Sequence, residues 1–210
     1  SLQPDKCPWG DLDVDIVFEC TGKFCNKEKA SLHLAAGASQ VLLSAPGENA
    51  DKTIVYGVNH LSLTKKDKII SNASCTTNCL APLIQPLHQT FKIESGLMTT
   101  IHAYTSDQTL LDNNPSDLYR ARAAALSMIP AKTGAAKAIG LVIPELAGKL
   151  TGQAIRVPVA NVSLVDLTFT SSNPLSVESI NQCLIAAENS YLHGVLATNS
   201  LPLVSSDFNH

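Results

Sequence analysis

The chain has 210 residues, of which 45% are hydrophobic and 16% charged, with a formal net charge of -3. This composition supports a sizeable folded core and excludes both a disordered tail and a small disulfide scaffold. The weak negative charge supplies no broad positive field, so we expect neither nucleic acid nor a membrane as a principal partner.

The first third of the sequence alternates short apolar runs with one helical pattern. The runs at residues 13–20, 40–46, 53–58 and 68–74 predict strands, and residues 26–38 predict a helix. Short apolar strands alternating with a helix indicate a parallel sheet with helices on its faces.

The remainder of the sequence has a different pattern, typical of an α+β domain. It predicts helices over residues 76–91, 134–148 and 176–194, the last capped by Ser176, and a strand over 94–105. The polar stretch 105–124 carries no assignable regular structure. Residues 152–171 read as strand but are too long for one, and Pro158 and Asn161 interrupt them. The boundary between the two patterns lies near Cys75.

The opening SLQPDKCPWGDLD lacks the features of a signal peptide, and no apolar run approaches the roughly 18 residues of a membrane span. The six cysteines are scattered without a paired framework, which favours reduced thiols over disulfides. We therefore expect a cytoplasmic protein.

Cys75 lies in SNASCTTNC, residues 71–79, between a predicted strand and a predicted helix. Free N–H groups and the helix dipole at such a position favour a thiolate, and therefore a nucleophile. A cysteine that merely fills space is the commoner case, but the hydroxyl and amide neighbours argue against it. Cys79 raises a metal alternative, which a lone pair at this spacing supports only weakly, so we expect no metal.

A reactive thiol needs a proton acceptor, and His102 is a candidate. Arg120 and Arg122 precede Thr133 and Gly134 at a predicted helix start, and Arg156 lies in AIRVP. Helix-start amides beside arginines indicate a phosphate site, although a solvated surface charge is the default for any single arginine.

Four segments, SNASCTTNCLAP, LMTTIHAYTSDQ, SMIPAKTGAAKAIG and AIRVPVANVSLVDLTF, closely resemble the phosphorylating glyceraldehyde-3-phosphate dehydrogenases, and DLYRARAAA resembles their bacterial form. The resemblance implies a partial doubly wound, Rossmann-type parallel sheet followed by an α+β catalytic domain with a mostly antiparallel sheet. The corresponding expected domains are the C-terminal part of an NAD-binding domain (1–74) and a catalytic domain (75–210). It also implies a homotetramer.

The same resemblance implies roles for individual residues. Cys75 would be the nucleophile and His102 its proton acceptor, in the NAD-dependent conversion of glyceraldehyde 3-phosphate and inorganic phosphate to 1,3-bisphosphoglycerate. The substrate phosphate would lie at Thr105, Asp107 and Arg156, with Asp107 orienting arginine. The attacking phosphate would lie at Ser74, Thr76, Arg120, Thr133 and Gly134. NAD would be lined by Thr21, Gly22, Phe24 and Ser44.

The sequence departs from the family pattern at both ends. It contains no GxGxxG turn with a following acidic residue, and it stops at VSSDFNH, before the family's last strands. We therefore expect an incomplete piece of a longer molecule. Three alternatives stay open: an erythrose-4-phosphate dehydrogenase, a non-catalytic remnant acting as a binding or assembly partner, and a cysteine hydrolase using Cys75 and His102 without redox chemistry.

Overall fold

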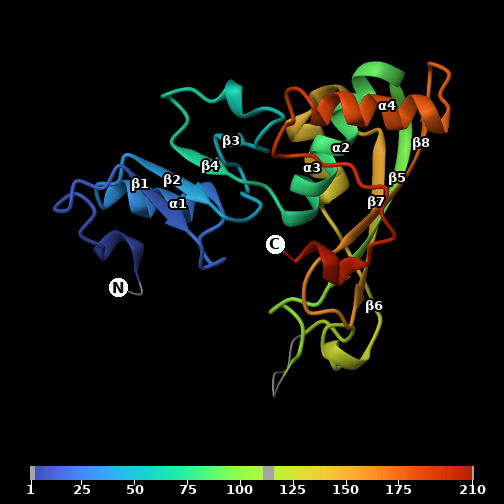
Figure 1. Cartoon of the computed structure of the whole chain (residues 1–210). Helices are drawn as coiled ribbons and strands as arrows, with labels where there is room; N and C mark the ends of the chain where they lie inside the picture. Colours follow the sequence, from blue (N-terminus) through green and yellow to red (C-terminus); the bar gives the residue numbers. More distant parts are fainter. Residues whose placement is uncertain (1–2, 111–115, 210) are drawn as a thin grey trace.

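The structure, a computed structural model that describes residues 3–110 and 116–209, has two lobes (Figure 1). The described residues of the first lobe form two short 3-10 turns, four strands and one helix: η1 (Pro4–Lys6), β1 (Ile16–Glu19), α1 (Lys27–Ala35), β2 (Gln40–Leu43), β3 (Lys52–Thr53), η2 (His60–Ser62) and β4 (Ile69–Ser71). Its sheet has the order β1-β2-β4-β3, and every pairing is parallel. The expected parallel sheet is confirmed.

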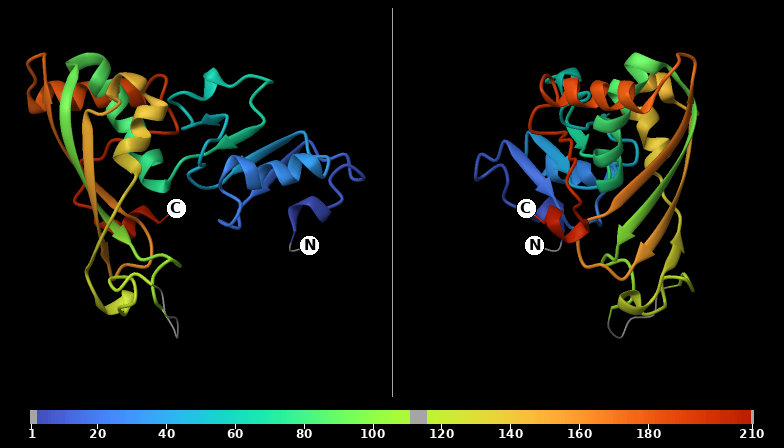
Figure 2. Two further views of the ribbon diagram at one scale, coloured as in Figure 1. Left: turned by 180° about the vertical axis from the view of Figure 1, so that it is seen from behind. Right: turned by 45° about the vertical axis from the view of Figure 1, so that its right-hand side comes forward.

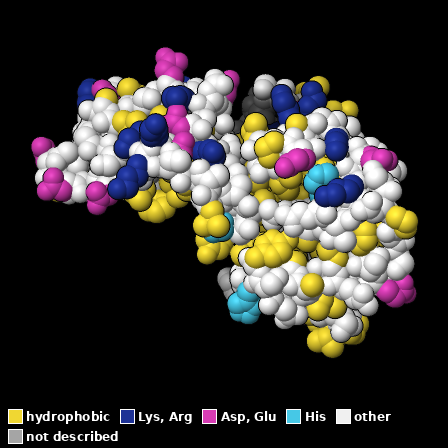
Figure 3. All heavy atoms as spheres, turned by 90° about the horizontal axis from the view of Figure 1, so that it is seen from above, with side chains coloured by type: hydrophobic (Ala, Val, Ile, Leu, Met, Phe, Trp, Pro, Cys, Tyr) yellow, Lys and Arg dark blue, Asp and Glu magenta, His cyan; other side chains and the backbone are white. Residues whose placement is uncertain are grey.

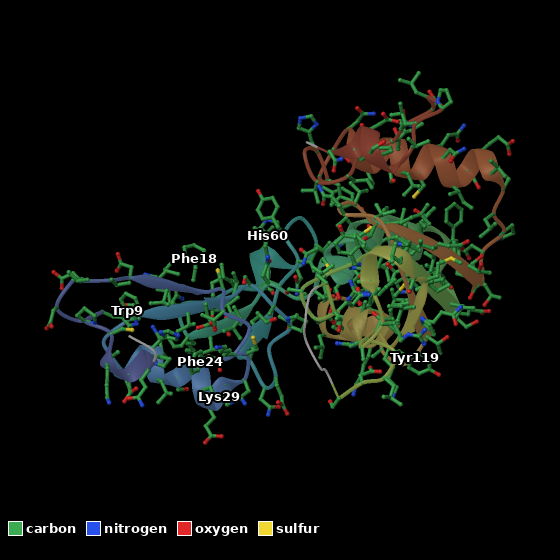
Figure 4. The ribbon with its side chains drawn as sticks, turned by 90° about the horizontal axis from the view of Figure 1, so that it is seen from below. Trp9, Phe18, Phe24, Lys29, His60 and Tyr119 are labelled. Carbon is green, nitrogen blue, oxygen red and sulfur yellow. The ribbon has the colours of Figure 1, made fainter. Side chains whose placement is uncertain are left out.

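The core of the first lobe lies between its sheet and α1. Val41, Leu43 and Ile69 from the strands pack with Ala30 of the helix, and all four are buried. Asn26 caps α1 by accepting a hydrogen bond from the backbone N–H of Lys29 at 2.8 Å. The opposite face of the sheet carries Phe18, which Figure 4 shows pointing away from the side that holds α1. An apolar cavity of about 530 Å³ lies on that face.

The strand predicted over residues 53–58 is mostly wrong, because β3 ends at Thr53. The backbone N–H of Val55 donates to the Asn59 side chain at 2.8 Å, and that of Val58 donates to the Val55 carbonyl at 3.1 Å. These local bonds form a turn in place of a longer ladder.

The second lobe is a mixed sheet covered by helices. Its elements are α2 (Cys75–Phe91), β5 (Ile93–Ala103), η3 (Ala124–Leu126), β6 (Ile129–Ala131), α3 (Ala135–Val142), η4 (Pro144–Leu146), β7 (Leu150–Val157), β8 (Leu164–Ser171), α4 (Val177–Glu188) and η5 (Ser205–Phe208). The strand order is β6-β7-β5-β8, with β5 and β7 parallel and the outer pairings antiparallel. Figure 2 shows α2, α3 and α4 on one face of this sheet.

Helix α2 forms the centre of the second lobe. Leu80 and Ile84 are fully buried, and they belong to one cluster with Met98 of β5 and Ile139 of α3. The helix runs unbroken through Pro82 and Pro86, both buried, even though each proline removes a backbone donor. Packing against several elements therefore outweighs the local cost of the two prolines.

Several predicted boundaries move in the structure. The helix predicted over 134–148 ends at Val142, and a 3-10 turn begins at Pro144, which cannot donate a helical hydrogen bond. The long run 152–171 is two strands, β7 and β8, separated around Pro158 as expected. Ser176 caps α4 as predicted. Of the unassigned polar stretch, residues 111–115 lie outside the described residues.

The view in Figure 3 shows acidic and basic side chains interspersed over the first lobe. Such mixing agrees with the small net charge of the chain. In the part of the chain that the structure describes, no helix combines the length and apolar character needed to cross a bilayer.

Candidate active site

The thiol of Cys75 is held at the first position of α2 by a tightly bonded turn. Ala73 takes a left-handed conformation, with φ 56°. The Ser74 hydroxyl then caps the helix, accepting from the backbone N–H of Thr77 at 3.1 Å. The amide of Asn78 donates to the carbonyl oxygens of Asn72 and Ser74, at 2.7 and 3.0 Å. Part of the polar neighbourhood of Cys75 therefore shapes the turn that presents the sulfur.

Cys75 and His102 come together although they lie on different elements. Cys75 Sγ is 3.2 Å from His102 Nε2, which projects from the end of β5. His102 is 8% exposed and therefore buried, whereas Cys75 is exposed. An exposed sulfur beside a largely buried imidazole can meet a substrate and exchange a proton with the ring.

The pair opens into a cavity of about 420 Å³. Its lining includes Thr76, Cys79, Thr100 and Thr105, together with residues 160–163 of the loop between β7 and β8. Desolvation, followed by the charge of Cys75, raises the pKa of the Cys79 thiol. Thr100 is 1% exposed, and its hydroxyl has no partner among the described residues. The cavity thus combines the Cys75 thiol with polar groups that a bound molecule could satisfy.

Two arginines lie beside the pair, connected by Asp107. Arg156 donates from Nη1 to the Ala103 carbonyl at 2.9 Å and contacts His102 Nδ1 at 2.7 Å. Arg120 Nη1 donates to Asp107 at 2.6 Å, and the nearest approach of Arg156 to the same carboxylate is 3.9 Å. Asp107 also accepts from the Thr105 hydroxyl. Asp107 therefore contacts both arginines, and its role in orienting them stays a prediction.

Thr133 and Gly134 lie at the start of α3, which packs against α2. The Thr133 hydroxyl accepts from the backbone N–H of Ala135 at 3.2 Å, and a side chain added at Gly134 would meet open space. Both positions are thus at a helix N-terminus, as the sequence indicated. Their role in holding phosphate stays a prediction.

The residues expected to line a cofactor gather at the carboxyl ends of β1 and β2. Thr21 and Gly22, the latter with φ +71°, lie two and three residues after the end of β1, and Ser44 follows β2. The Ser44 hydroxyl donates to the Glu19 carbonyl at 3.2 Å. The Phe24 ring meets His33 edge-on at 6.2 Å. In open α/β sheets, ligands bind beyond the carboxyl ends of the strands, so the placement fits a dinucleotide.

Glu19 fixes the turn after β1, a feature that the sequence analysis missed. Glu19 is 3% exposed, and its carboxylate accepts from the backbone N–H of Thr21 at 2.7 Å, from the Thr21 hydroxyl and from His33 Nε2 at 3.0 Å. Trp9 Nε1 donates to the other ring nitrogen of His33 at 3.1 Å. Burial works to raise the pKa of Glu19, but its hydrogen bonds with Thr21 and His33 hold it below the ordinary value. In the sequence, Glu19 is only an acidic residue at the end of a predicted strand. Nothing in that pattern indicates its hydrogen bonds with Thr21 and His33.

The sequence analysis did not place Thr100 or Cys79 in a cavity with Cys75 and His102, although a signal for each placement exists. Thr100 lies two residues before His102 on one strand, and alternation places both on the same face. Cys79 lies one helical turn after Cys75, on the same face of α2.

Residues 74–210 match the family described as glyceraldehyde 3-phosphate dehydrogenase, C-terminal domain. The chain is 59% identical over 208 residues to the plasmid glyceraldehyde-3-phosphate dehydrogenase of Cupriavidus necator, covering 99% of this chain and 62% of that protein. It is 60% identical over 207 residues to the Pseudomonas aeruginosa enzyme, covering 99% and 61%, and 53% identical over 210 residues to glyceraldehyde-3-phosphate dehydrogenase 2 of Bacillus subtilis, covering 100% and 62%. The chain thus spans about 62% of the length of these relatives. It belongs to the glyceraldehyde-3-phosphate dehydrogenase family.

Proposed function

We propose that the protein carrying this chain is an NAD-dependent, phosphorylating glyceraldehyde-3-phosphate dehydrogenase of glycolysis. The observation that carries the proposal is the 3.2 Å contact between Cys75 Sγ and His102 Nε2 in a cavity of about 420 Å³, with Arg156 Nη1 2.7 Å from the other ring nitrogen of His102. The relatives bear the name of this enzyme, which supports the same activity.

Cys75 would attack the aldehyde carbon, because its sulfur lies at a helix N-terminus that favours negative charge. His102 would accept the hydroxyl proton of the resulting hemithioacetal. When bound, NAD supplies the acceptor for the hydride. The sulfur would remain bonded to the acyl carbon as a thioester until inorganic phosphate displaces it and forms 1,3-bisphosphoglycerate.

The two anions would be held by separate groups. Thr105, Asp107 and Arg156 would serve the substrate phosphate, with Asp107 acting through arginine. Inorganic phosphate would lie near the start of α2, at Ser74, Thr76, Arg120, Thr133 and Gly134. Thr76 lines the cavity and the Ser74 hydroxyl lies one residue from the thiol, which supports this placement. Helix N-termini are favourable anion sites.

NAD would be held at the edge of the first sheet by Thr21, Gly22, Phe24 and Ser44. We propose that residues 1–74 are the C-terminal part of the cofactor domain and 75–210 the catalytic domain. The change from a parallel to a mixed sheet at α2, and the start of the family match at residue 74, support this division. We further propose a homotetramer located in the cytoplasm.

Formation of NADH from glyceraldehyde 3-phosphate, measured in the purified protein with and without inorganic phosphate, tests the proposal. Phosphate should stimulate turnover, and Cys75→Ser should abolish it. Cys183→Ser is the matched control, because Cys183 lies on α4 and contacts Thr90. His102→Asn should reduce the rate by about 10²–10⁴-fold. Turnover that ignores phosphate, or that survives Cys75→Ser, would refute the proposal.

The same assay separates the alternatives. Erythrose 4-phosphate turned over faster than glyceraldehyde 3-phosphate would favour the related sugar dehydrogenase, and ester hydrolysis without NAD would favour a hydrolase. A protein that binds neither NAD nor aldehyde would favour the non-catalytic alternative.

A further inference from the structure

Glu19 bonds to both hydroxyl residues expected at the edge of the cofactor site. Its carboxylate oxygen Oε1 accepts from the backbone N–H of Thr21 at 2.7 Å and from the Thr21 hydroxyl. Its backbone carbonyl accepts from the backbone N–H of Ser44 at 3.0 Å and from the Ser44 hydroxyl at 3.2 Å. One residue therefore connects the carboxyl ends of β1 and β2, where NAD is proposed to bind.

The same bonds fix the direction of the two hydroxyl protons. A hydroxyl has one proton and two lone pairs. The proton of Thr21 points at the Glu19 carboxylate, and one lone pair accepts from the backbone N–H of Lys23 at 3.2 Å. The proton of Ser44 points at the Glu19 carbonyl. Toward a bound molecule both hydroxyls can therefore only accept, which suits the hydroxyl and amino groups of a nucleoside and disfavours phosphate oxygens.

His33 of α1 holds the second oxygen of the same carboxylate. His33 Nε2 is 3.0 Å from Glu19 Oε2, and the two side chains are 7% and 2% exposed. Trp9 Nε1 donates to His33 Nδ1 at 3.1 Å, so the proton of the imidazole is on Nε2 and points at Glu19. The Phe24 ring contacts the same imidazole edge-on, with ring centroids 6.2 Å apart. His33 therefore orients the carboxylate toward Thr21 and also supports Phe24.

We propose that Glu19 and His33 are positioning residues for NAD, which hold residues 21–24 in place and direct the lone pairs of the Thr21 hydroxyl toward the cofactor. The inference rests on the proposed function, in which this turn lines NAD. Both side chains are buried and bonded to protein groups, so they act through Thr21 and Phe24 and do not touch NAD. The expected effect of their loss is on cofactor affinity and not on the chemical step.

The charge of Glu19 strengthens its hold on the turn. Burial works to raise the pKa of Glu19, but its hydrogen bonds with Thr21 and His33 keep that pKa below the ordinary value, so the carboxylate is ionised at neutral pH. Hydrogen bonds to an ionised acceptor are about twice as strong as those between neutral groups. A neutral side chain at position 19 would therefore hold the turn less firmly.

Calorimetric titration with NAD measures this affinity without catalysis, in the protein that carries this chain and at a temperature where each variant is folded. Glu19→Met removes both oxygens and keeps an unbranched side chain, and it should weaken NAD binding by about 10–100-fold, the range for lost hydrogen bonds to a charged group. Combined with Thr21→Val, it should cost less than the product of the two single effects, because Glu19 acts partly through the Thr21 hydroxyl. Val41→Ala, in the core of the same lobe, is the control, which should lower thermal stability and leave NAD affinity unchanged.

His33 supplies a second pair of variants, which decides the question if Glu19→Met fails to fold. His33→Gln keeps an N–H near the position of Nε2 and should retain NAD affinity, whereas His33→Leu removes that donor and should weaken binding. In turnover assays the weakened variants should show a raised KM for NAD. Their kcat at saturating NAD and their KM for glyceraldehyde 3-phosphate should not change, because Cys75 and His102 lie in the other lobe.

Four results would each overturn the inference. They are equal NAD affinity in Glu19→Met and the wild type, fully multiplicative effects of Glu19→Met and Thr21→Val, equal affinity in His33→Gln and His33→Leu, and an affinity loss in Val41→Ala as large as that in Glu19→Met. In all four the wild type still binds NAD, so the proposed function stands. Failure of the wild type to bind NAD would instead refute the proposed cofactor site, and the inference with it.

Discussion

Replacing Glu19 by glutamine should destabilise the first lobe, because every group that contacts the Glu19 carboxylate is a hydrogen-bond donor. The indole of Trp9 can only donate, so His33 Nδ1 must accept its hydrogen bond. His33 Nε2 must then carry the N–H that donates to Glu19. Glu19 accepts from Thr21 as well. A glutamine has one acceptor oxygen, so in either orientation its NH₂ group faces a donor.

The expected loss is about 2–4 kcal/mol of the free energy of unfolding, because one hydrogen bond to a buried charge is removed and a buried donor is left without a partner. The loss should also depend on pH. The pKa of Glu19 is lowered in the fold, so its stabilisation is complete above the ordinary value of 4.5 and disappears as pH falls through the lowered native value. The variant and the wild type should therefore converge in acid.

Urea unfolding followed by tryptophan fluorescence measures this effect locally, because Trp9 is the only tryptophan and belongs to the network. Glu28→Gln is the matched control, since Glu28 is an exposed glutamate of α1. Equal unfolding midpoints for Glu19→Gln and the wild type at neutral pH would refute the reasoning. A difference that persists unchanged in acid would show that the charge of Glu19 is not its source.

Three further substitutions probe the second lobe. Ser74→Ala removes the cap that accepts from Thr77 and should cost about 0.5–2 kcal/mol by thermal unfolding; an unchanged Tm would exclude the capping role. Burial, followed by the charges of Lys149 and a second lysine, lowers the pKa of His88. As pH falls, the unfolded chain therefore takes up a proton at this histidine before the folded chain does. The free energy of unfolding should decrease as pH drops below 6.5. His88→Leu should flatten that part of the stability profile, and a profile that keeps its slope would assign the acid sensitivity elsewhere. Leu80→Ala should cost about 2–5 kcal/mol in urea unfolding, because Leu80 is fully buried; a loss under 1 kcal/mol would mean that the core refills the space.

The sequence predicted the elements best where local pattern and tertiary pairing agree. The break between β7 and β8 was predictable because Pro158 cannot continue a ladder. The strand over 53–58 failed because the side chain of Asn59 captures a backbone N–H, a competition that apolar composition does not reveal.

For the candidate site, too, the sequence predicts features that depend on local position and does not predict contacts that depend on tertiary packing. The sequence predicts a role for Cys75 from its position between a strand and a helix, but the contact of Cys75 with His102 depends on how α2 packs on β5. The bond from Arg156 to His102 depends on the register of two parallel strands whose residues are far apart in sequence. Residue types and spacing carry no information on that register.

Helix α2 begins with Cys75 and continues as the central element of the apolar interior, with Leu80 and Ile84 about one and a half and two and a half turns beyond Cys75. Cavities or overpacking around these turns will tilt or shift the helix, and the sulfur will move with it relative to His102. Substitutions remote from the chemistry can therefore alter turnover before they unfold the lobe, so hydrophobic positions facing α2 should tolerate fewer replacements than equally buried positions around β2.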